Sequence, residues 1–412
     1  MLGTTLRYRL SANSNSVFSA TGSLIGYLFQ CRYALLESLR RLRTTQEFTV
    51  SLETLDDVVF EANGDPPELL QTKHHLNRAA NLTDASPDLW KTLRIWCEGL
   101  SNGTIPGDST FFLITTGQAP EGSAAQYLRA NEDRDISKAL ERLSATAESS
   151  TNQDNEKAYT AFRGLSEDDR RKLVTAMVVV DGVPAIANLD AALREIVFYA
   201  VERRFLDPFL ERLEGWWLRR AIKHLTRAET IAPILSEELV AETTRLREQF
   251  KQDNLPIDDE ILRASVDASG YQDKIFVHQL RLIEVGNSRI FHAIRNYFRA
   301  FEQRSRWIRE DLLLVGELDR YEDRLIEEWD LLFQRMRDEL GDETAELAKT
   351  RAATTLYHWV ETGVHLPIRP GVNEPSISRG TYQMLADSMR VGWHPDYAEL
   401  LKQVLEPQES QR

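Results

Sequence analysis

The spacing of apolar residues along the chain indicates where helices and strands form. Between Ser23 and Leu42, apolar residues recur every three or four positions, which predicts a helix (Leu24, Leu28, Cys31, Leu35, Leu39 and Leu42). Alternation replaces this spacing at Phe48–Leu52, and a short β-rich run follows at Val58–Phe60. The turn signal Asn63–Pro67 then leads into a third predicted strand at Glu68–Lys73.

Two further elements complete the pattern of the N-terminal region. A helix is predicted around Pro87–Leu100, and a buried strand at Phe111–Thr116. The order of helix, three strands, helix and strand predicts an α/β unit with helices on both sides of a small mixed sheet. The polar segment 131–172 follows, in which Ser144–Lys157 is expected to be a loop, and one more strand is predicted within Leu173–Val180.

From Leu189 onward the apolar spacing is almost entirely helical. Helices are predicted at about 189–204, 206–226, 235–252, 276–346 and 350–362, with a final helical pair that ends near Leu405. A length of 412 residues favours two domains, and the proline-containing segment Asn254–Asp259 is a plausible boundary. We expect an α/β domain at 1–185, a helical linker region at 186–255 and a helical domain at 256–412.

Composition narrows the class of protein. Hydrophobic residues make up 42% and charged residues 28%, an ordinary balance for a soluble protein. Cys31 and Cys97 lie among helical apolar residues and are expected to be buried free thiols in a reducing cytosol. Neither an N-terminal leader pattern nor a long apolar stretch is present, so we expect a soluble cytoplasmic protein. A glycine-rich phosphate loop is also missing, which argues against ATP hydrolysis by this chain.

The net charge of −14 bears on nucleic-acid binding. Contacts to phosphate dominate the affinity of most nucleic-acid binders, so this charge argues against a free, high-affinity one. Local basic patches can coexist with an acidic whole. An acidic DNA enzyme would need a partner or self-assembly to hold its substrate.

Candidate chemistry is concentrated around the second and third predicted strands. Residues two apart in a strand share a face, so Gln71 and Lys73 are expected on one face and Thr72 on the other. Asp57 can lie opposite them if its strand pairs across the Asn63–Pro67 turn. Mg²⁺, or Mn²⁺, prefers oxygen ligands, which Asp57 and Gln71 would supply. Lys73 would orient the attacking water or stabilise charge at a scissile phosphate.

Several alternatives stay open at this point. Glu53 could be a second carboxylate, and Asp56 competes with Asp57 because alternation does not settle which of them points inward. All three acidic residues could instead form a solvated turn. Lys73 and the two histidines after it could be an exposed strand end. His74 and His75 would point to opposite faces of a strand and so make a poor metal pair.

Three segments together resemble a known nuclease family. They are Gly26-Tyr-Leu-Phe-Gln30, Glu53-Thr-Leu-Asp-Asp57 and Leu70-Gln-Thr-Lys-His-His75, and they resemble the double-stranded DNA nuclease domain of CBASS anti-phage effectors over roughly residues 17–120. The resemblance implies a PD-(D/E)xK, restriction-endonuclease-like fold and a Mg²⁺-dependent DNA endonuclease. It implies a catalytic set of Glu53, Asp57, Gln71 and Lys73, with the first three as metal ligands. Gln30 would be a supporting residue, and so would Asp56 if it is not the ligand.

The C-terminal part of the chain carries a second resemblance. The segments Ala293–Ala300, Gln303–Trp307, Tyr321–Trp329 and Val391–Pro395 resemble C-terminal domains of ABC three-component defence systems. Joined to the nuclease-like part, this region resembles the effector subunit of Lamassu-type systems. That resemblance implies double-stranded DNA as substrate, an SMC-like ATPase and a small middle subunit as partners, and possible homo-oligomerisation through the helical region. No membrane partner is implied.

Two other functions remain open. Gln71 replaces the acidic residue found in many relatives, which allows a catalytically inactive scaffold or adaptor. An RNase with the same metal site is the third possibility.

Read without the resemblance, the aromatic and basic clusters of the helical region favour structural roles. The aromatic stripe between Ile290 and Ile308 is typical of a core. Acidic residues are interleaved with the neighbouring arginines, which favours a solvated face or intersubunit ion pairs. Trp216 and Trp217 have basic residues beside them. This cluster is expected to be part of the core with a polar rim rather than a DNA-binding site. Trp393-His394-Pro395 is expected to be structural.

Overall fold

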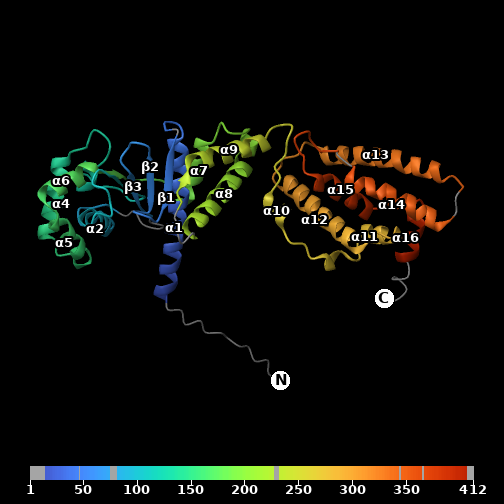
Figure 1. Ribbon diagram of the computed structural model, residues 1–412. Helices are drawn as coiled ribbons and strands as arrows, with labels where there is room; N and C mark the ends of the chain where they lie inside the picture. The colour runs from blue at the N-terminus through green and yellow to red at the C-terminus, as the bar shows by residue number, and fades with distance from the viewer. Residues whose placement is uncertain are drawn as a thin grey trace, which may run out of the picture. The chain divides into compact units, whose positions relative to one another are not determined.

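The computed structural model describes residues 14–45, 47–74, 81–226, 232–342, 345–363 and 366–405. Two compact units divide the chain, the first covering residues 1–244 and the second 245–412 (Figure 1). Their internal structures differ in kind. The first contains a sheet, whereas every described regular element of the second is a helix.

A six-stranded mixed sheet organises the first unit. Its strands are β1 (Phe48–Leu52), β2 (Val58–Ala62), β3 (Glu68–Lys73), β4 (Thr110–Thr115), β5 (Met177–Val180) and β6 (Ile234–Leu235). Their order is β5-β4-β3-β2-β1-β6. The pairs β3–β4 and β4–β5 are parallel, while the pairs β6–β1, β1–β2 and β2–β3 are antiparallel. The strands predicted at 48–52, 58–60 and 68–73 are therefore present and adjacent.

Helices cover both faces of this sheet (Figure 1). On one side lie α2 (Pro87–Ser101), α3 (Ala124–Tyr127), α4 (Ile136–Ser149), α5 (Glu156–Gly164) and α6 (Glu167–Ala176), and on the other α1 (Ser14–Arg41), α7 (Leu189–Ile196) and α8 (Leu206–Thr226). Alternate strand residues such as Leu69, Leu113 and Val179 join Trp90 and Trp96 of α2 in one hydrophobic core. Removing this apolar surface from water is the main force that holds the layers together.

The polar segment 131–172 is helical, contrary to the loop predicted at Ser144–Lys157. Helix α4 continues to Ser149, a short 3₁₀ turn spans Gln153–Asn155, and α5 begins at Glu156. Ala139, Leu143 and Ala147 are buried at helical spacing, so the many polar residues are the solvent faces of amphipathic helices. Residues 173–176 likewise belong to α6, and the strand predicted there begins only at Met177.

Most of the predicted linker region packs into the first unit. Strand β6 extends the sheet beside β1, with Thr49 opposite Leu235 and Val50 opposite Ile234. Trp217 of α8 is buried and its indole N–H donates to the Cys31 carbonyl at 2.8 Å. This burial confirms the structural interpretation of Trp217. Helix α9 (Ser236–Gln249) spans the boundary between the two units.

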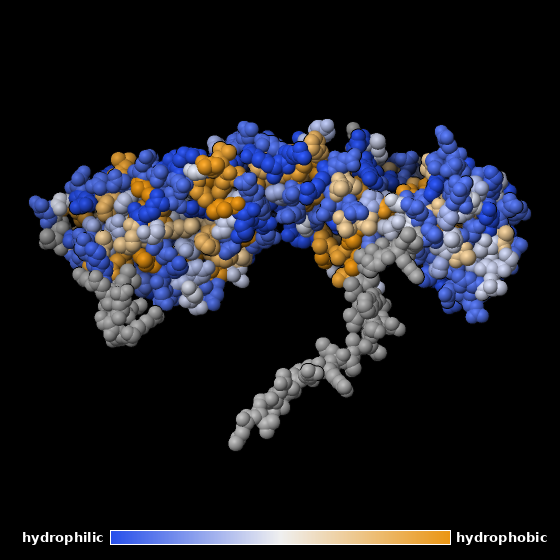
Figure 2. All heavy atoms as spheres, turned by 180° about the vertical axis from the view of Figure 1, so that it is seen from behind, coloured by the Kyte–Doolittle hydropathy of each residue, from blue (hydrophilic) through white to orange (hydrophobic). Residues whose placement is uncertain are grey.

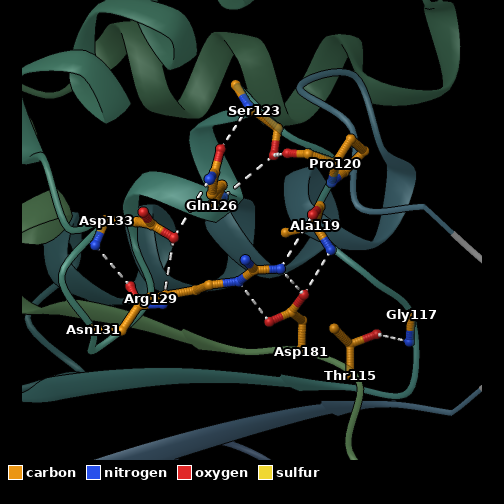
Figure 3. Close-up of polar contacts among 11 residues, drawn as sticks. Thr115, Gly117, Ala119, Pro120, Ser123, Gln126, Arg129, Asn131, Asp133 and Asp181 are labelled. Atoms are coloured by element: carbon orange, nitrogen blue, oxygen red, sulfur yellow. Dashed lines mark hydrogen bonds and ion pairs between the residues drawn. The ribbon is translucent and has the colours of Figure 1, made fainter.

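Hydrogen bonds fasten the loops that follow β4 and β5 (Figure 3). Asp181 accepts from Arg129 Nε at 2.9 Å and from the Ala119 amide at 2.8 Å, and Arg129 also donates to the Ala119 carbonyl. Arg129 holds the pKa of Asp181 below its usual value, although burial opposes this shift. These contacts fix the carboxyl ends of the two parallel strands.

The second unit is a bundle of helices. They are α10 (Asp259–Arg263), α11 (Ile275–Leu282), α12 (Asn287–Arg309), α13 (Glu317–Leu340), α14 (Glu346–Thr362), α15 (Pro375–Asp387) and α16 (Tyr397–Leu405), with a 3₁₀ turn at Ala268–Tyr271. The helical region predicted from 276 to 346 is thus interrupted at 283–286 and at 310–316, and α13 ends at Leu340. Left-handed residues mark the breaks, Glu284 with φ 57° and Asp311 with φ 53°.

Aromatic residues of α12 and of the chain end form the core of this bundle. Trp307 is fully buried, and its indole N–H donates to the Pro256 carbonyl at 2.7 Å. Trp393 is also fully buried and packs beside Tyr357 and Tyr382. The structural role predicted for Trp393 is therefore confirmed. The core role predicted for the aromatic stripe is confirmed in part, because Phe301 and Ile308 are exposed.

The surface agrees with the acidic, polar composition. Hydrophilic residues cover most of the face seen in Figure 2, and apolar residues gather there in separate patches. Within the described ranges, none of the helices combines the length and the apolar character needed to cross a membrane. Cys31 and Cys97 are buried free thiols, as predicted.

Candidate active site

Most of the predicted site residues gather around one pocket of the first unit. It has a volume of about 260 Å³, and we call it the acidic pocket. Its lining residues come from α1, from the turn between β1 and β2 and from the end of β3: Ser23, Gly26, Tyr27, Gln30, Glu53, Asp57, Thr72, Lys73 and His74. Four of the predicted residues, Gln30, Glu53, Asp57 and Lys73, are among them.

Asp57 is held in the acidic pocket by the neighbouring strand. Its Oδ2 accepts from the Thr72 amide at 2.8 Å and from the Thr72 hydroxyl at 2.9 Å. Asp57 stands just before β2, whose first residue, Val58, is paired with Leu70 of β3. The carboxylate therefore accepts a backbone amide of β3 in place of a strand-pairing hydrogen bond, and this fixes its position.

Asp56 points into the core instead. Its Oδ2 accepts from the Trp96 indole N–H at 2.6 Å, and its Oδ1 accepts from the Asp57 amide at 3.0 Å. Asp56 does not line the acidic pocket, whereas Asp57 does. The choice between these two neighbours, which alternation leaves open, is thus made by the indole of α2.

Burial of Asp56 predicts an unusual dependence of stability on pH. Desolvation raises the pKa of Asp56 from 3.8 to about 7, against the opposing effect of the Trp96 hydrogen bond. The folded state therefore binds an extra proton between pH 3.8 and about 7, so the free energy of unfolding should fall as pH rises through this window. Each pKa unit corresponds to about 1.4 kcal/mol, which sets an upper limit of about 4 kcal/mol on the loss.

The variant Asp56→Asn tests this dependence. Urea denaturation of the first unit across the window should give a flatter profile for the variant than for the native chain. Asp88→Asn, on the outer first turn of α2, is the matched control. Parallel profiles for the native chain and Asp56→Asn would contradict the raised pKa.

Glu53 adopts a conformation that L-residues rarely take. Its φ is 51°, in the left-handed region, and its amide donates to the Asp57 carbonyl at 3.1 Å. Such strain persists where the surroundings enforce it and is common at functional sites. Desolvation and then the charge of Asp57 raise the pKa of Glu53, while a hydrogen bond from Gln30 and the charge of Lys73 lower it. The two carboxylates thus repel one another across the pocket.

A histidine of α8 anchors the backbone immediately before Glu53. The Leu52 amide donates to His224 Nε2 at 3.0 Å, and His224 Nδ1 lies 2.9 Å from the Ala232 carbonyl. With Nδ1 as donor to that carbonyl, Nε2 can accept from the Leu52 amide, so one tautomer of the ring makes both contacts. Helix α8 consequently contributes to the position of Glu53, although it is remote in the sequence.

The end of β3 supplies the basic side of the acidic pocket. Lys73 is partly buried, and His74 Nε2 accepts from the Ile186 amide at 3.1 Å while its ring lies 4.8 Å from the Phe29 ring. His75 lies outside the described residues.

Gln71 differs from the expectation. Its residue is only 3% exposed, and it does not line the acidic pocket. Alternation along β3 places Gln71 with Leu69 on the face of the core that contains Trp96, and Thr72 on the face of Asp57. Asp57 is therefore hydrogen-bonded to Thr72 rather than to Gln71, and the role of Gln71 as a metal ligand stays a prediction. Gln71 Oε1 is buried without a hydrogen bond to any described residue.

The donor set suits a hard cation with few protein ligands. In the described parts of the chain no three His, Cys, Asp or Glu side chains converge as a metal cluster. Two carboxylates do meet, Glu53 and Asp57, and their mutual repulsion would be relieved by a cation. Mg²⁺ commonly uses one or two carboxylates and retains several waters. These residues fit such an ion.

Sequence reasoning missed Tyr27 and Thr72 as pocket residues. Tyr27 stands three positions before Gln30, so the helical period of α1 brings both to one face. Burial raises the pKa of the Tyr27 hydroxyl, which keeps it protonated as a donor. Thr72 could have been found only from the register of β2 with β3.

One protein family matches part of the chain. Residues 276–401 match the family model of C-terminal domain 7 of the ABC-three component (ABC-3C) systems. This match associates the helical unit with those systems. No curated protein matches the chain in sequence.

Solved structures with distant similarity include two SAVED/CARF-domain containing Cap4 receptors. The one from Moraxella osloensis is 12% identical, with a TM-score of 0.35 over 68% of this chain and 69% of its own. The one from Acinetobacter baumannii is 14% identical, with a TM-score of 0.32 over 69% of this chain and 61% of its own. Likeness at this level carries no argument about the activity of the chain described above.

Proposed function

We propose that this chain is a Mg²⁺-dependent double-stranded DNA endonuclease that acts as the effector of an anti-phage ABC three-component system. The observation that carries the nuclease proposal is the acidic pocket, where Glu53 and Asp57 face Lys73. Two fixed carboxylates and one ammonium in a solvent-accessible pocket are what phosphodiester hydrolysis with a hard cation requires. The defence context is supported by the ABC-3C match at residues 276–401.

Each residue has a role in this proposal. Mg²⁺, or Mn²⁺ in its place, would supply Lewis-acid stabilisation of charge on the phosphate when bound by Glu53 and Asp57. Lys73 orients the attacking water or stabilises the charge that develops on the phosphate oxygens. Gln30 positions Glu53 through their hydrogen bond. The proposal does not depend on Gln71, because that side chain is buried away from the pocket.

The proposal includes partner proteins because the chain carries a large negative net charge. A net charge of −14 disfavours tight binding of DNA by the free chain. We therefore expect the helical unit to dock the chain on an SMC-like ATPase and a small middle subunit, as in Lamassu-type systems, with release or oligomerisation providing DNA binding. Full cleavage activity of an isolated monomer would contradict this regulation.

Plasmid cleavage by the co-purified complex tests the activity. We expect linear and nicked products with Mg²⁺, none with a chelator, and none from Lys73→Ala in either condition. Lys91→Ala, an exposed lysine of α2, controls for loss of one positive charge. RNA incubated in parallel distinguishes an RNase. Phage protection that survives both Lys73→Ala and Asp57→Ala would favour a scaffold instead.

A further inference from the structure

A second polar pocket lies in the helical unit, outside the machinery described above. It has a volume of about 320 Å³ and is lined by residues of α12, α14 and α15. Three arginines, Arg295, Arg299 and Arg379, share it with His292 and Ser376, and we call it the arginine pocket. Its size falls at the small end of the range for pockets that bind small molecules.

Arg295 and Arg299 of α12, and Arg379 of α15, differ from two other arginines of α12. Arg304 pairs with Glu322, and Arg306 pairs with Glu260 and Glu310. By contrast, in the described part of the chain none of the three pocket arginines forms an ion pair with a carboxylate. Arg295 contacts His292 Nδ1 at 2.9 Å, and Arg299 donates to the Leu262 carbonyl.

Their buried polar atoms also lack partners. The Nε atoms of Arg295, Arg299 and Arg379 are buried and make no hydrogen bond to the described residues, which is also true of Arg304 Nε. Desolvation, and next the neighbouring charge of Arg295, lower the pKa of Arg299, while the charge of Glu374 opposes this shift. The cluster therefore holds more positive charge than its surroundings neutralise.

The N-terminus of α15 opens into the same pocket. Helix α15 has 13 residues and begins with Pro375, and the Glu374 side chain caps it by accepting from the Ser376 amide at 3.1 Å. Ser376 is 3% exposed, lines the pocket, and its hydroxyl has no partner among the described residues. A buried hydroxyl without a partner is unfavourable, and a bound acceptor would supply the missing hydrogen bond. The helix dipole favours an anion at this end.

Acidic residues near the pocket do not cancel this charge. Glu361 is engaged by Arg289, whose Nε lies 3.0 Å from its Oε1. Glu374 is the second lining acid, and its carboxylate is used for the helix cap. Three guanidinium groups and a helix N-terminus thus face one capping carboxylate.

We propose that the arginine pocket binds a phosphate group, either inorganic phosphate or the phosphate of a small phosphorylated molecule. A dianion matches several guanidinium groups better than a single carboxylate does, and arginine forks suit phosphate oxygens. The Ser376 hydroxyl would donate to one of these oxygens. The site lies in the unit without the nuclease pocket, so it is independent of the proposed function.

Calorimetric titration of the full chain with sodium phosphate, at constant ionic strength and without divalent cations, tests the site. We expect saturable binding by about 10 mM, weakened at least about tenfold in Arg379→Gln, and less strongly in Ser376→Ala. Arg351→Gln, an exposed arginine of α14, removes the same charge outside the pocket and should change binding less than about twofold. Circular dichroism checks that each variant is folded.

Adenosine monophosphate and adenosine distinguish the sources of phosphate. Tighter binding of the monophosphate than of inorganic phosphate would identify a phosphorylated molecule as the ligand, and equal binding would identify the phosphate group alone. Adenosine should not bind. Three results would overturn the site: no saturable heat with either phosphate, equal weakening by Arg379→Gln and Arg351→Gln, or unchanged affinity in both Arg379→Gln and Ser376→Ala.

Discussion

Replacing Asp57 with asparagine is expected to reduce Mg²⁺-dependent DNA cleavage at least about 10³-fold, because the loss of several kcal/mol of charge stabilisation corresponds to such a factor. The fold should survive the change. Asp57 Oδ2 accepts two hydrogen bonds from Thr72, and the amide oxygen of asparagine can accept both. Only the charge facing Lys73 and Glu53 is removed.

A matched variant separates charge at the pocket from charge elsewhere. Asp65→Asn changes an exposed carboxylate in the turn between β2 and β3 and should leave cleavage within about twofold, because an exposed charge is well screened. Single-turnover cleavage rates and thermal unfolding midpoints are measured for both variants. Cleavage by Asp57→Asn at the native rate, with a normal melting profile, would remove Asp57 from the mechanism.

Gly380→Ala is expected to destabilise the helical unit by about 3 kcal/mol or more, at the upper end of the overpacking range. Helix α15 crosses α12 at this residue. A Cβ atom there would lie 2.0 Å from the Asn296 carbonyl oxygen and 2.5 Å from the Ala300 Cβ. Both neighbouring atoms belong to α12, so the steric overlap can be removed only if α12 and α15 move apart.

Hydrogen exchange locates this loss, because it reports each helix separately. Amides of α12 and α15 should exchange faster in Gly380→Ala, while those of β1 to β4 should be unchanged. Gly215→Ala in α8 is the control. Nothing lies within 4 Å of a Cβ there, so the change should stabilise the chain by about 0.5–1 kcal/mol. Unaltered protection of α12 and α15 in Gly380→Ala would contradict the close crossing.

Periodicity predicted the elements whose residues alternate or repeat clearly. Strand β1, helix α2 and helix α8 begin within a residue or two of the expected positions. The helices between 136 and 176 were missed because short amphipathic helices expose mostly polar residues, which resemble a loop in composition. Strand β6 has only two residues and is created by its pairing with β1, which no local pattern reveals.

The site was predictable as a set of residues but not in its orientation. Spacing and resemblance brought forward Glu53, Asp57 and Lys73, and all three line the acidic pocket. The burial of Gln71 follows from the register of β3 between β2 and β4, which is a tertiary property. Similarly, the inward turn of Asp56 depends on the Trp96 indole, a partner 40 positions away.

Strand β6 has a consequence for how this sequence can be recombined during evolution. It covers the outer edge of β1, and α8 brings His224 to the backbone beside Glu53. A gene fusion joined after residue 185 would leave that edge unpaired and open to aggregation, and would separate Glu53 from its anchor. A joint near residue 244 preserves both. We therefore expect residues up to about 244 to be inherited together, including α7, α8 and β6. The helical unit can then be exchanged without disturbing the acidic pocket.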